Sequence, residues 1–146
     1  MQQSFILAVI VGLIGGVAVG LQGPLSSLMS QRIGTMGSVF IVHIGGAIIA
    51  GVLLLVLGAG NLADWRKVPW YALVAGVFGV IVISAVSHTI PRIGAAATVT
   101  LIITAQLILS TLLDNFGLLG TSVRPFDLPR VAGIAVLLVG TWLIVR

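Results

Sequence analysis

Five apolar blocks dominate the sequence, and each is long enough to cross a lipid bilayer. They cover about residues 4–21, 36–57, 68–87, 94–113 and 128–145. A helix that rises about 1.5 Å per residue needs about 20 residues to cross a hydrocarbon core of about 30 Å. Because that core offers no water to unpaired backbone groups, helices are the form such blocks take. The sequence therefore predicts an all-α membrane protein with five transmembrane helices in a single transmembrane domain, residues 1–146.

The low charge content supports a lipid environment. Charged residues make up only 7% of the chain and hydrophobic residues 59%, whereas about 25% of a soluble domain is charged. The seven Lys and Arg residues are scattered among the loops and form no basic face of the kind that binds nucleic acid. We therefore expect the lipid bilayer as a partner, and no nucleic acid.

The basic residues are divided almost evenly between the two sides of the membrane. Five spans place the two ends of the chain on opposite sides. One side then receives four basic residues and the other three: Arg66, Lys67, Arg124 and Arg130 against Arg32, Arg92 and Arg146. Membrane proteins are oriented by a clear excess of Lys and Arg on the cytoplasmic side. The balance fits either a single orientation with little bias, or dual topology with copies that pair as an antiparallel dimer.

Small residues form stripes on two of the spans. Gly12, Gly16 and Gly20 follow one another at four-residue spacing, and Gly133 and Gly140 lie two turns apart. Within a bilayer, helices associate by close approach at small residues, because lipid tails are as apolar as leucine. We predict helix-packing surfaces here, either within the chain or between two copies. Five spans enclose little interior, which also favours a dimer.

Polar residues inside the spans are the candidates for a substrate path. Intramembrane polar groups are costly and often functional. Gln106 and Ser110 lie on one face of the fourth span, His43 lies two turns into the second, and Gln22 ends the first. Histidine also suits proton transfer near neutral pH. The alternative role for these side chains is hydrogen bonding between helices.

Two further features concern the ends of spans. Gln22-Gly23-Pro24 predicts a helix stop at the membrane interface, because proline lacks an amide donor. Asp114 closes the fourth span, where the helix dipole disfavours an anion. A partner is therefore expected for it, such as Arg92, Arg124 or a free backbone amide.

The sequence lacks the residues that several classes of function require. No carboxylate stands at the centre of a span, which argues against a simple exchanger of cations for protons. Cysteine is absent, and two histidines without nearby acidic residues make a weak metal site. No nucleophile motif or phosphate-binding loop is present. We expect no enzymatic activity, no metal and no cofactor.

The fourth and fifth spans carry a family resemblance. Its residues are Gly94-Ala95-Ala96-Ala97-Thr98, Gln106-Leu107-Ile108, Ser110, Leu113-Asp114-Asn115-Phe116-Gly117 and the Arg130, Gly133, Leu137 and Gly140 series. Together they resemble the YdcZ-like family of the drug/metabolite transporter superfamily. The last stripe is also similar to the dimerisation helix of the small multidrug resistance proteins. Ser26 departs from the asparagine of many YdcZ-like members.

The resemblance implies a multi-pass exporter of the bacterial inner (plasma) membrane, and it strengthens the case for an antiparallel homodimer. We therefore predict a small-solute transporter that works by alternating access as a dimer. The alternatives are a dimeric channel for a small ion or solute, and a non-transporting helper subunit of a larger membrane complex. The resemblance supplies no substrate and no binding residue.

Overall fold

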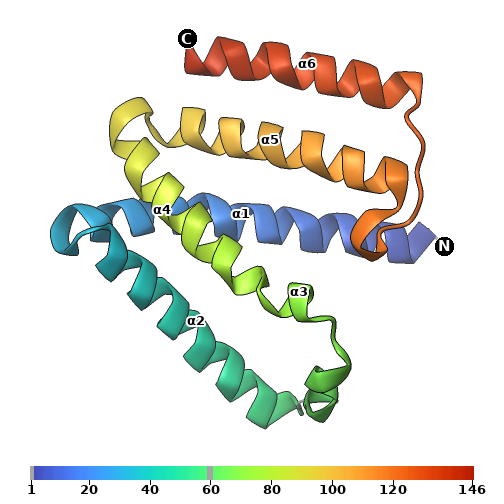
Figure 1. Ribbon diagram of the computed structural model, residues 1–146. Helices are drawn as coiled ribbons and strands as arrows, with labels where there is room; N and C mark the ends of the chain where they lie inside the picture. Colours follow the sequence, from blue (N-terminus) through green and yellow to red (C-terminus); the bar gives the residue numbers. More distant parts are fainter. Residues whose placement is uncertain (1, 59–60) are drawn as a thin grey trace. The chain divides into compact units, whose positions relative to one another are not determined.

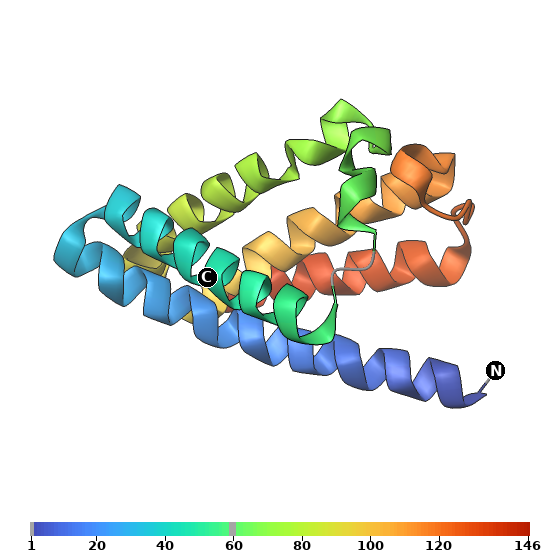
Figure 2. The same cartoon turned by 90° about the horizontal axis from the view of Figure 1, so that it is seen from below.

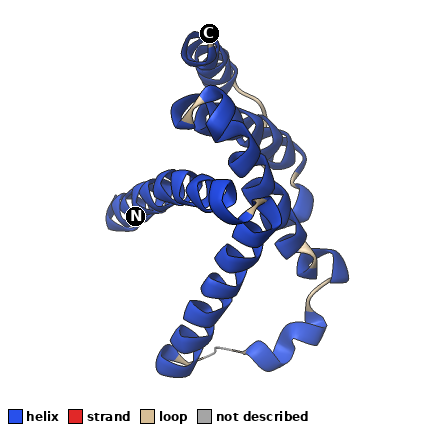
Figure 3. Ribbon diagram, turned by 90° about the vertical axis from the view of Figure 1, so that its left-hand side faces the viewer, coloured by secondary structure: helices blue, strands red, loops and turns tan. Residues whose placement is uncertain are grey.

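The computed structural model describes residues 2–58 and 61–146, with side chains from Phe5 onward. Helices and loops make up all of this part, which contains no strand (Figure 3). The elements, in chain order, are α1 (Gln2–Ile33), α2 (Thr35–Leu57), η1 (Leu62–Lys67), α3 (Trp70–Leu73), α4 (Ala75–Ile93), α5 (Ala95–Phe116), η2 (Leu118–Gly120) and α6 (Leu128–Val145).

Five helical segments are long and apolar enough to span a membrane. They are Phe5–Ile33, Thr35–Leu57, Trp70–Ile93, Ala95–Phe116 and Leu128–Val145. The prediction of an all-α membrane protein with five transmembrane helices is therefore confirmed. The chain divides into two compact units, residues 1–91 and 92–146, which are described in turn.

The first unit begins with a helical hairpin. Helices α1 and α2 pack against each other beside the turn at Gly34 (Figures 1 and 2). The Ser38 hydroxyl donates to the Ser26 carbonyl oxygen over 2.8 Å, and Ser30 and Thr35 join their hydroxyls over 3.1 Å. Small hydroxyl side chains allow this close approach and supply the bonds that hold it.

Helix α1 does not end where the sequence predicts. It continues unbroken through Gln22 and Pro24 to Ile33, eleven residues beyond the expected stop. Proline removes one amide from the helical ladder, and its ring crowds the carbonyl four residues earlier. That residue is Gly20, and Gly23 precedes the proline, so little side-chain bulk adds to the crowding. Membrane helices also tolerate proline better than water-exposed helices do.

The third span is interrupted near its beginning and extended at its end. Val74 leaves the helical conformation, with φ −84° and ψ 5°, and separates the short α3 from α4. Helix α4 then passes through Pro91 to Ile93, beyond the predicted end at residue 87. Both prolines therefore lie inside helices rather than after them.

The second unit contains α5 and α6, which lie side by side (Figure 1). The connecting loop is tied to the end of α5, because the Arg124 amide donates to the Asp114 backbone oxygen over 2.9 Å and the Phe126 amide to the Asn115 side chain over 3.0 Å. Asp127 caps α6 by accepting from the Arg130 amide over 2.9 Å. The loop therefore fixes where α6 begins relative to the end of α5.

Small polar side chains occupy most of the buried positions. Among the residues whose side chains the structure describes, eight serines and threonines are buried, whereas the buried apolar residues are Val39, Ile83, Val86 and Ala97. Large apolar residues such as Phe78, at 64% exposure, point outward instead. This is the reverse of a soluble core and is typical of helices that pack through small residues in lipid.

Candidate functional site

Two of the predicted path residues line one hollow in the first unit. Gln22 of α1 and His43 of α2 lie there with residues of α4, and the hollow has a volume of about 360 Å³. The remaining lining residues are Val42, Gly46, Gly79, Val82 and Ile83. The lining therefore contains no Asp, Glu, Lys or Arg. It combines an amide and an imidazole with an apolar wall, which suits a small solute that forms a few hydrogen bonds.

The imidazole of His43 is held in a defined orientation. Its Nδ1 lies 2.8 Å from the Val39 carbonyl oxygen, which can only accept, so Nδ1 carries the proton in this contact. The other ring nitrogen, Nε2, is then an acceptor in the neutral ring. This nitrogen lies toward α4, because a Cβ added to Gly79 would be 2.8 Å from it. Glycine at position 79 leaves the space that the ring fills.

Helix α1 packs closely on α4 at Gly23, the residue after Gln22. A Cβ on Gly23 would be 3.3 Å from Val86 Cγ1 and 3.4 Å from Ile90 Cδ1. Gly23 is buried, as are Ser26 and Ser27 on the following turn of α1, whereas Gln22 is exposed. The missing side chain at Gly23 therefore brings the Gln22 region of α1 close to α4.

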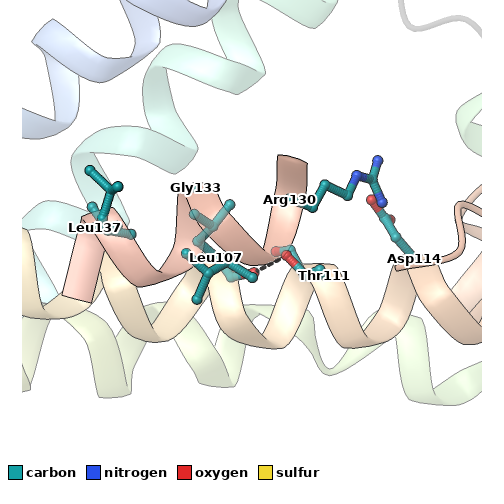
Figure 4. A pocket seen from close by; sticks show the side chains of 9 residues that line it. Leu107, Thr111, Asp114, Arg130, Gly133 and Leu137 are labelled. Carbon is teal, nitrogen blue, oxygen red and sulfur yellow. Dashed lines mark hydrogen bonds between the residues drawn. The ribbon is translucent and has the colours of Figure 1, made fainter. Parts of the chain in front are cut away.

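The other two candidates lie in the second unit. Ser110 lines a larger hollow of about 540 Å³ between α5 and α6 (Figure 4). Gln106 is exposed on α5 and does not line this hollow. Within the first unit the structure brings Gln22 and His43 together, and within the second unit Ser110 lines a hollow of its own. A path that includes all four stays a prediction.

The Ser110 hollow has a charged end. Its lining is Leu107, Ser110, Thr111, Asp114, Arg130, Gly133, Ile134, Val136 and Leu137. Arg130 and Asp114 extend toward one another at one end, and Leu107, Gly133 and Leu137 lie toward the other (Figure 4). The backbone amide of Arg124 donates to the carbonyl oxygen of Asp114. The partner predicted for the carboxylate itself is not found among the hydrogen bonds and ion pairs of the described residues.

A contact between two threonines joins the two helices of the second unit. Thr104 and Thr141 bring their hydroxyl oxygens within 2.6 Å in a buried contact between α5 and α6. Thr104 therefore forms a hydrogen bond between the two helices.

The predicted packing glycines have open space beside them. For Gly12, Gly16, Gly20, Gly133 and Gly140, no heavy atom of the described structure lies within 4 Å of an added Cβ, apart from their own helix and chain neighbours. By contrast, a Cβ added to Gly23 or Gly79 would lie within 3.4 Å of a side chain of another helix. The α1 stripe thus has no partner in its own unit, and its role as a contact between copies stays a prediction.

A short repeat was missed in the sequence. Arg92-Ile93-Gly94 repeats the tripeptide Arg32-Ile33-Gly34, and each copy ends one span and begins the next. Gly34 and Gly94 have nearly equal φ values of 82° and 83°. Comparison of the two halves of the sequence could have revealed both turns.

Metal binding finds no support in the described residues, which contain no group of three or more His, Cys, Asp or Glu side chains that could hold an ion.

Comparison with known proteins identifies the family. A family model described as "Putative inner membrane exporter, YdcZ" matches residues 7–143, nearly the whole chain. The chain belongs to the YdcZ family. Inner membrane protein YdcZ of Escherichia coli (strain K12) is 28% identical over 149 residues, which cover 100% of this chain and 98% of that protein. No solved structure matches the chain. With its five apolar helices, this YdcZ-family protein is a multi-pass protein of the inner membrane.

Proposed function

We propose that this YdcZ-family protein exports a small solute by alternating access. The observation that carries the proposal is the hollow shared by Gln22 and His43, two polar side chains from different spans that converge beside α4. Polar groups within a bilayer are costly unless they serve packing or transport. Because no carboxylate, Lys or Arg lines this hollow, the solute bound there is small and not a simple cation. The proposal includes no enzymatic step and no cofactor.

The proposed working unit is an antiparallel homodimer. Two observations support it: basic residues are balanced four against three between the two sides, and the glycine stripe of α1 has open space beside it. A pair of inverted copies would bury the stripe and enclose a path that five helices alone can hardly enclose. Membership of the drug/metabolite transporter superfamily belongs to the same proposal.

Flux kinetics test the transport mechanism. Purified protein is reconstituted in vesicles and offered a mixture of small polar and amphipathic metabolites, and the accumulated compounds are measured by mass spectrometry. The proposal predicts uptake that saturates and is accelerated by the same solute on the opposite side. Flux that rises linearly without exchange would instead identify a channel. Absence of uptake of any compound would contradict transport by this chain alone and favour a helper subunit.

Topology reporters test the dimer model. Fusions at Arg146 to one reporter that is active only in the cytoplasm, and to another that is active only outside it, should both give signal. Their balance should move to one side when Arg66 and Lys67 are replaced by Gln, because this removes two of the four charges on one side. Signal from one reporter alone in the unmodified chain would rule out an antiparallel dimer of identical copies.

A further inference from the structure

The hollow between α5 and α6 has the polarity of an amphiphile-binding site. Its charged end is formed by Asp114 in the last turn of α5 and Arg130 in the first turn of α6. Leu107 and Leu137 lie seven residues, about two helical turns, farther into their spans. Charge therefore lies at the interfacial end of the hollow and apolar surface toward the hydrocarbon.

The Asp114 carboxylate faces Arg130 across the hollow but forms no ion pair with it or with another described residue. Hydrogen bonds from Gly117 and Arg124 reach its backbone oxygen, but in this part of the chain no recorded hydrogen bond or ion pair reaches its carboxylate. The half-buried carboxylate also stands at the C-terminal end of α5, where the helix dipole disfavours negative charge. An ammonium group placed there would relieve both costs.

Arg130 has donors to spare for an anion. Its Nη1 donates to the Arg124 carbonyl over 3.0 Å, which uses one of the five N–H groups of a guanidinium. The remaining donors suit two oxygens of one phosphate. Arg130 lies opposite Asp114 in the hollow (Figure 4), so a positive group and a negative group of one ligand could each meet an opposite charge.

Gly133 keeps the apolar part of the hollow open. No heavy atom outside its immediate surroundings lies within 4 Å of an added Cβ there. The hollow, of about 540 Å³, therefore continues past this residue toward Leu137. A flexible acyl chain fits such a wall, whereas a small polar solute would leave it uncovered.

We propose that this hollow binds a phospholipid with a primary ammonium headgroup, of the phosphatidylethanolamine type. Asp114 receives the ammonium, Arg130 binds the phosphate, and an acyl chain lies along Leu107, Gly133 and Leu137. Phosphatidylglycerol and cardiolipin carry no ammonium that could meet the Asp114 carboxylate. Choline lipids carry a cation that has no N–H to donate. This inference does not depend on the proposed export function.

Lipid selectivity of the full chain tests the proposal. Detergent-solubilised protein is titrated with palmitoyl-oleoyl phosphatidylethanolamine, phosphatidylcholine or phosphatidylglycerol, and bound lipid is measured by native mass spectrometry. We expect the ethanolamine lipid to bind about tenfold more tightly than the choline lipid, the effect of about one charged hydrogen bond. Equal binding of these two lipids by the unmodified chain would overturn the proposal. So would binding of soluble glycerophosphoethanolamine as tight as that of the lipid.

Three substitutions assign the contacts. Asp114→Asn should abolish the preference for ethanolamine over choline, whereas the matched Asp64→Asn change at an exposed ion pair with Lys67 should preserve it. Arg130→Gln should weaken the binding of both the ethanolamine and the choline lipid, because both carry the phosphate. Gly133→Leu should weaken the binding of every lipid, because the larger side chain fills the hollow. An unchanged preference in Asp114→Asn, with native helical content, would contradict the assignment.

Discussion

At the scale of single residues, the most specific contact is that between His43 and Gly79. A Cβ at position 79 would lie 2.8 Å from His43 Nε2, which is closer than a Cβ carbon approaches other heavy atoms. The ring would have to turn away and stretch its 2.8 Å bond to Val39. Packing of this kind tolerates little added volume.

Gly79→Ala should therefore destabilise the protein by about 1–3 kcal/mol, the usual cost of overpacking. Unfolding by SDS in mixed micelles measures the change. Gly76→Ala is the matched control, because an added Cβ there meets nothing within 4 Å. Equal effects of the two substitutions would show that the ring does not occupy this space. In a His43→Ala background the cost of Gly79→Ala should largely disappear.

The hydrogen bond between Thr104 and Thr141 gives a second prediction at this scale. A double-mutant cycle with Thr104→Val and Thr141→Val should give a coupling energy of about 0.6 kcal/mol, typical of hydrogen bonds between membrane helices. The cycle uses the same unfolding assay. Thr100→Val is a suitable partner for a control cycle with Thr141→Val, since the Thr100 hydroxyl bonds within its own helix. Equal coupling energies in the two cycles would contradict a specific hydrogen bond between Thr104 and Thr141.

At the scale of elements, the two Arg-Ile-Gly turns explain how one long helix can follow another with a single residue, Gly34 or Gly94, between them. Gly34 has φ 82° and ψ 159°, and Gly94 has φ 83° and ψ 165°. Residues with side chains scarcely adopt this combination. Glycine is therefore required at one position in each turn.

Gly34→Ala and Gly94→Ala should each destabilise the protein by about 1–3 kcal/mol through backbone strain. Gly45→Ala should not, because Gly45 is helical and has open space beside it, and alanine favours a helix. Circular dichroism during thermal unfolding in detergent would compare the three variants. If Gly45→Ala were as destabilising as the other two, backbone strain would not be the cause.

The number and type of the elements could be predicted from the sequence, but their ends could not. Hydrophobic length alone determines five spans, because the bilayer sets the required length. The sequence predicts a helix stop at Pro24 and an end of the third span at residue 87, yet α1 continues through Pro24 and α4 through Pro91. The effect of a proline depends on whether its surroundings compensate for one missing hydrogen bond, and the local sequence does not contain that information.

At the scale of the whole molecule, the sequence could not reveal which spans are neighbours. Periodicity places Gln106 and Ser110 on one face of α5, but only Ser110 lines the hollow beside α6. Conversely, nothing in the spacing of Gln22 and His43 links them, and the contact of both helices with α4 brings them to one hollow. Gly23 and Gly79 lie at contacts between helices but belong to neither glycine stripe, so the spacing of glycines in the sequence does not identify them.

Cross-linking tests the proposed role of the α1 stripe in the dimer. The chain has no cysteine, so single-cysteine variants need no background substitutions. Gly16→Cys should form covalent dimers in membranes under mild oxidation, because the proposed interface brings two stripes together. Ile14→Cys lies about 200° away around the helix and should form few. Equal cross-linking at both positions would contradict an interface at the stripe.

The most direct test of the account is the flux of an accumulated metabolite through variants of the Gln22–His43 hollow. We predict that Gln22→Ala and His43→Ala each lower the saturable uptake by about tenfold, the effect of losing roughly one hydrogen bond to the solute. Gln31→Ala and His88→Ala, which change the same residue types outside the hollow, should stay within about twofold of the unmodified protein. Unchanged uptake in both hollow variants, at equal amounts of folded protein, would contradict transport through this site.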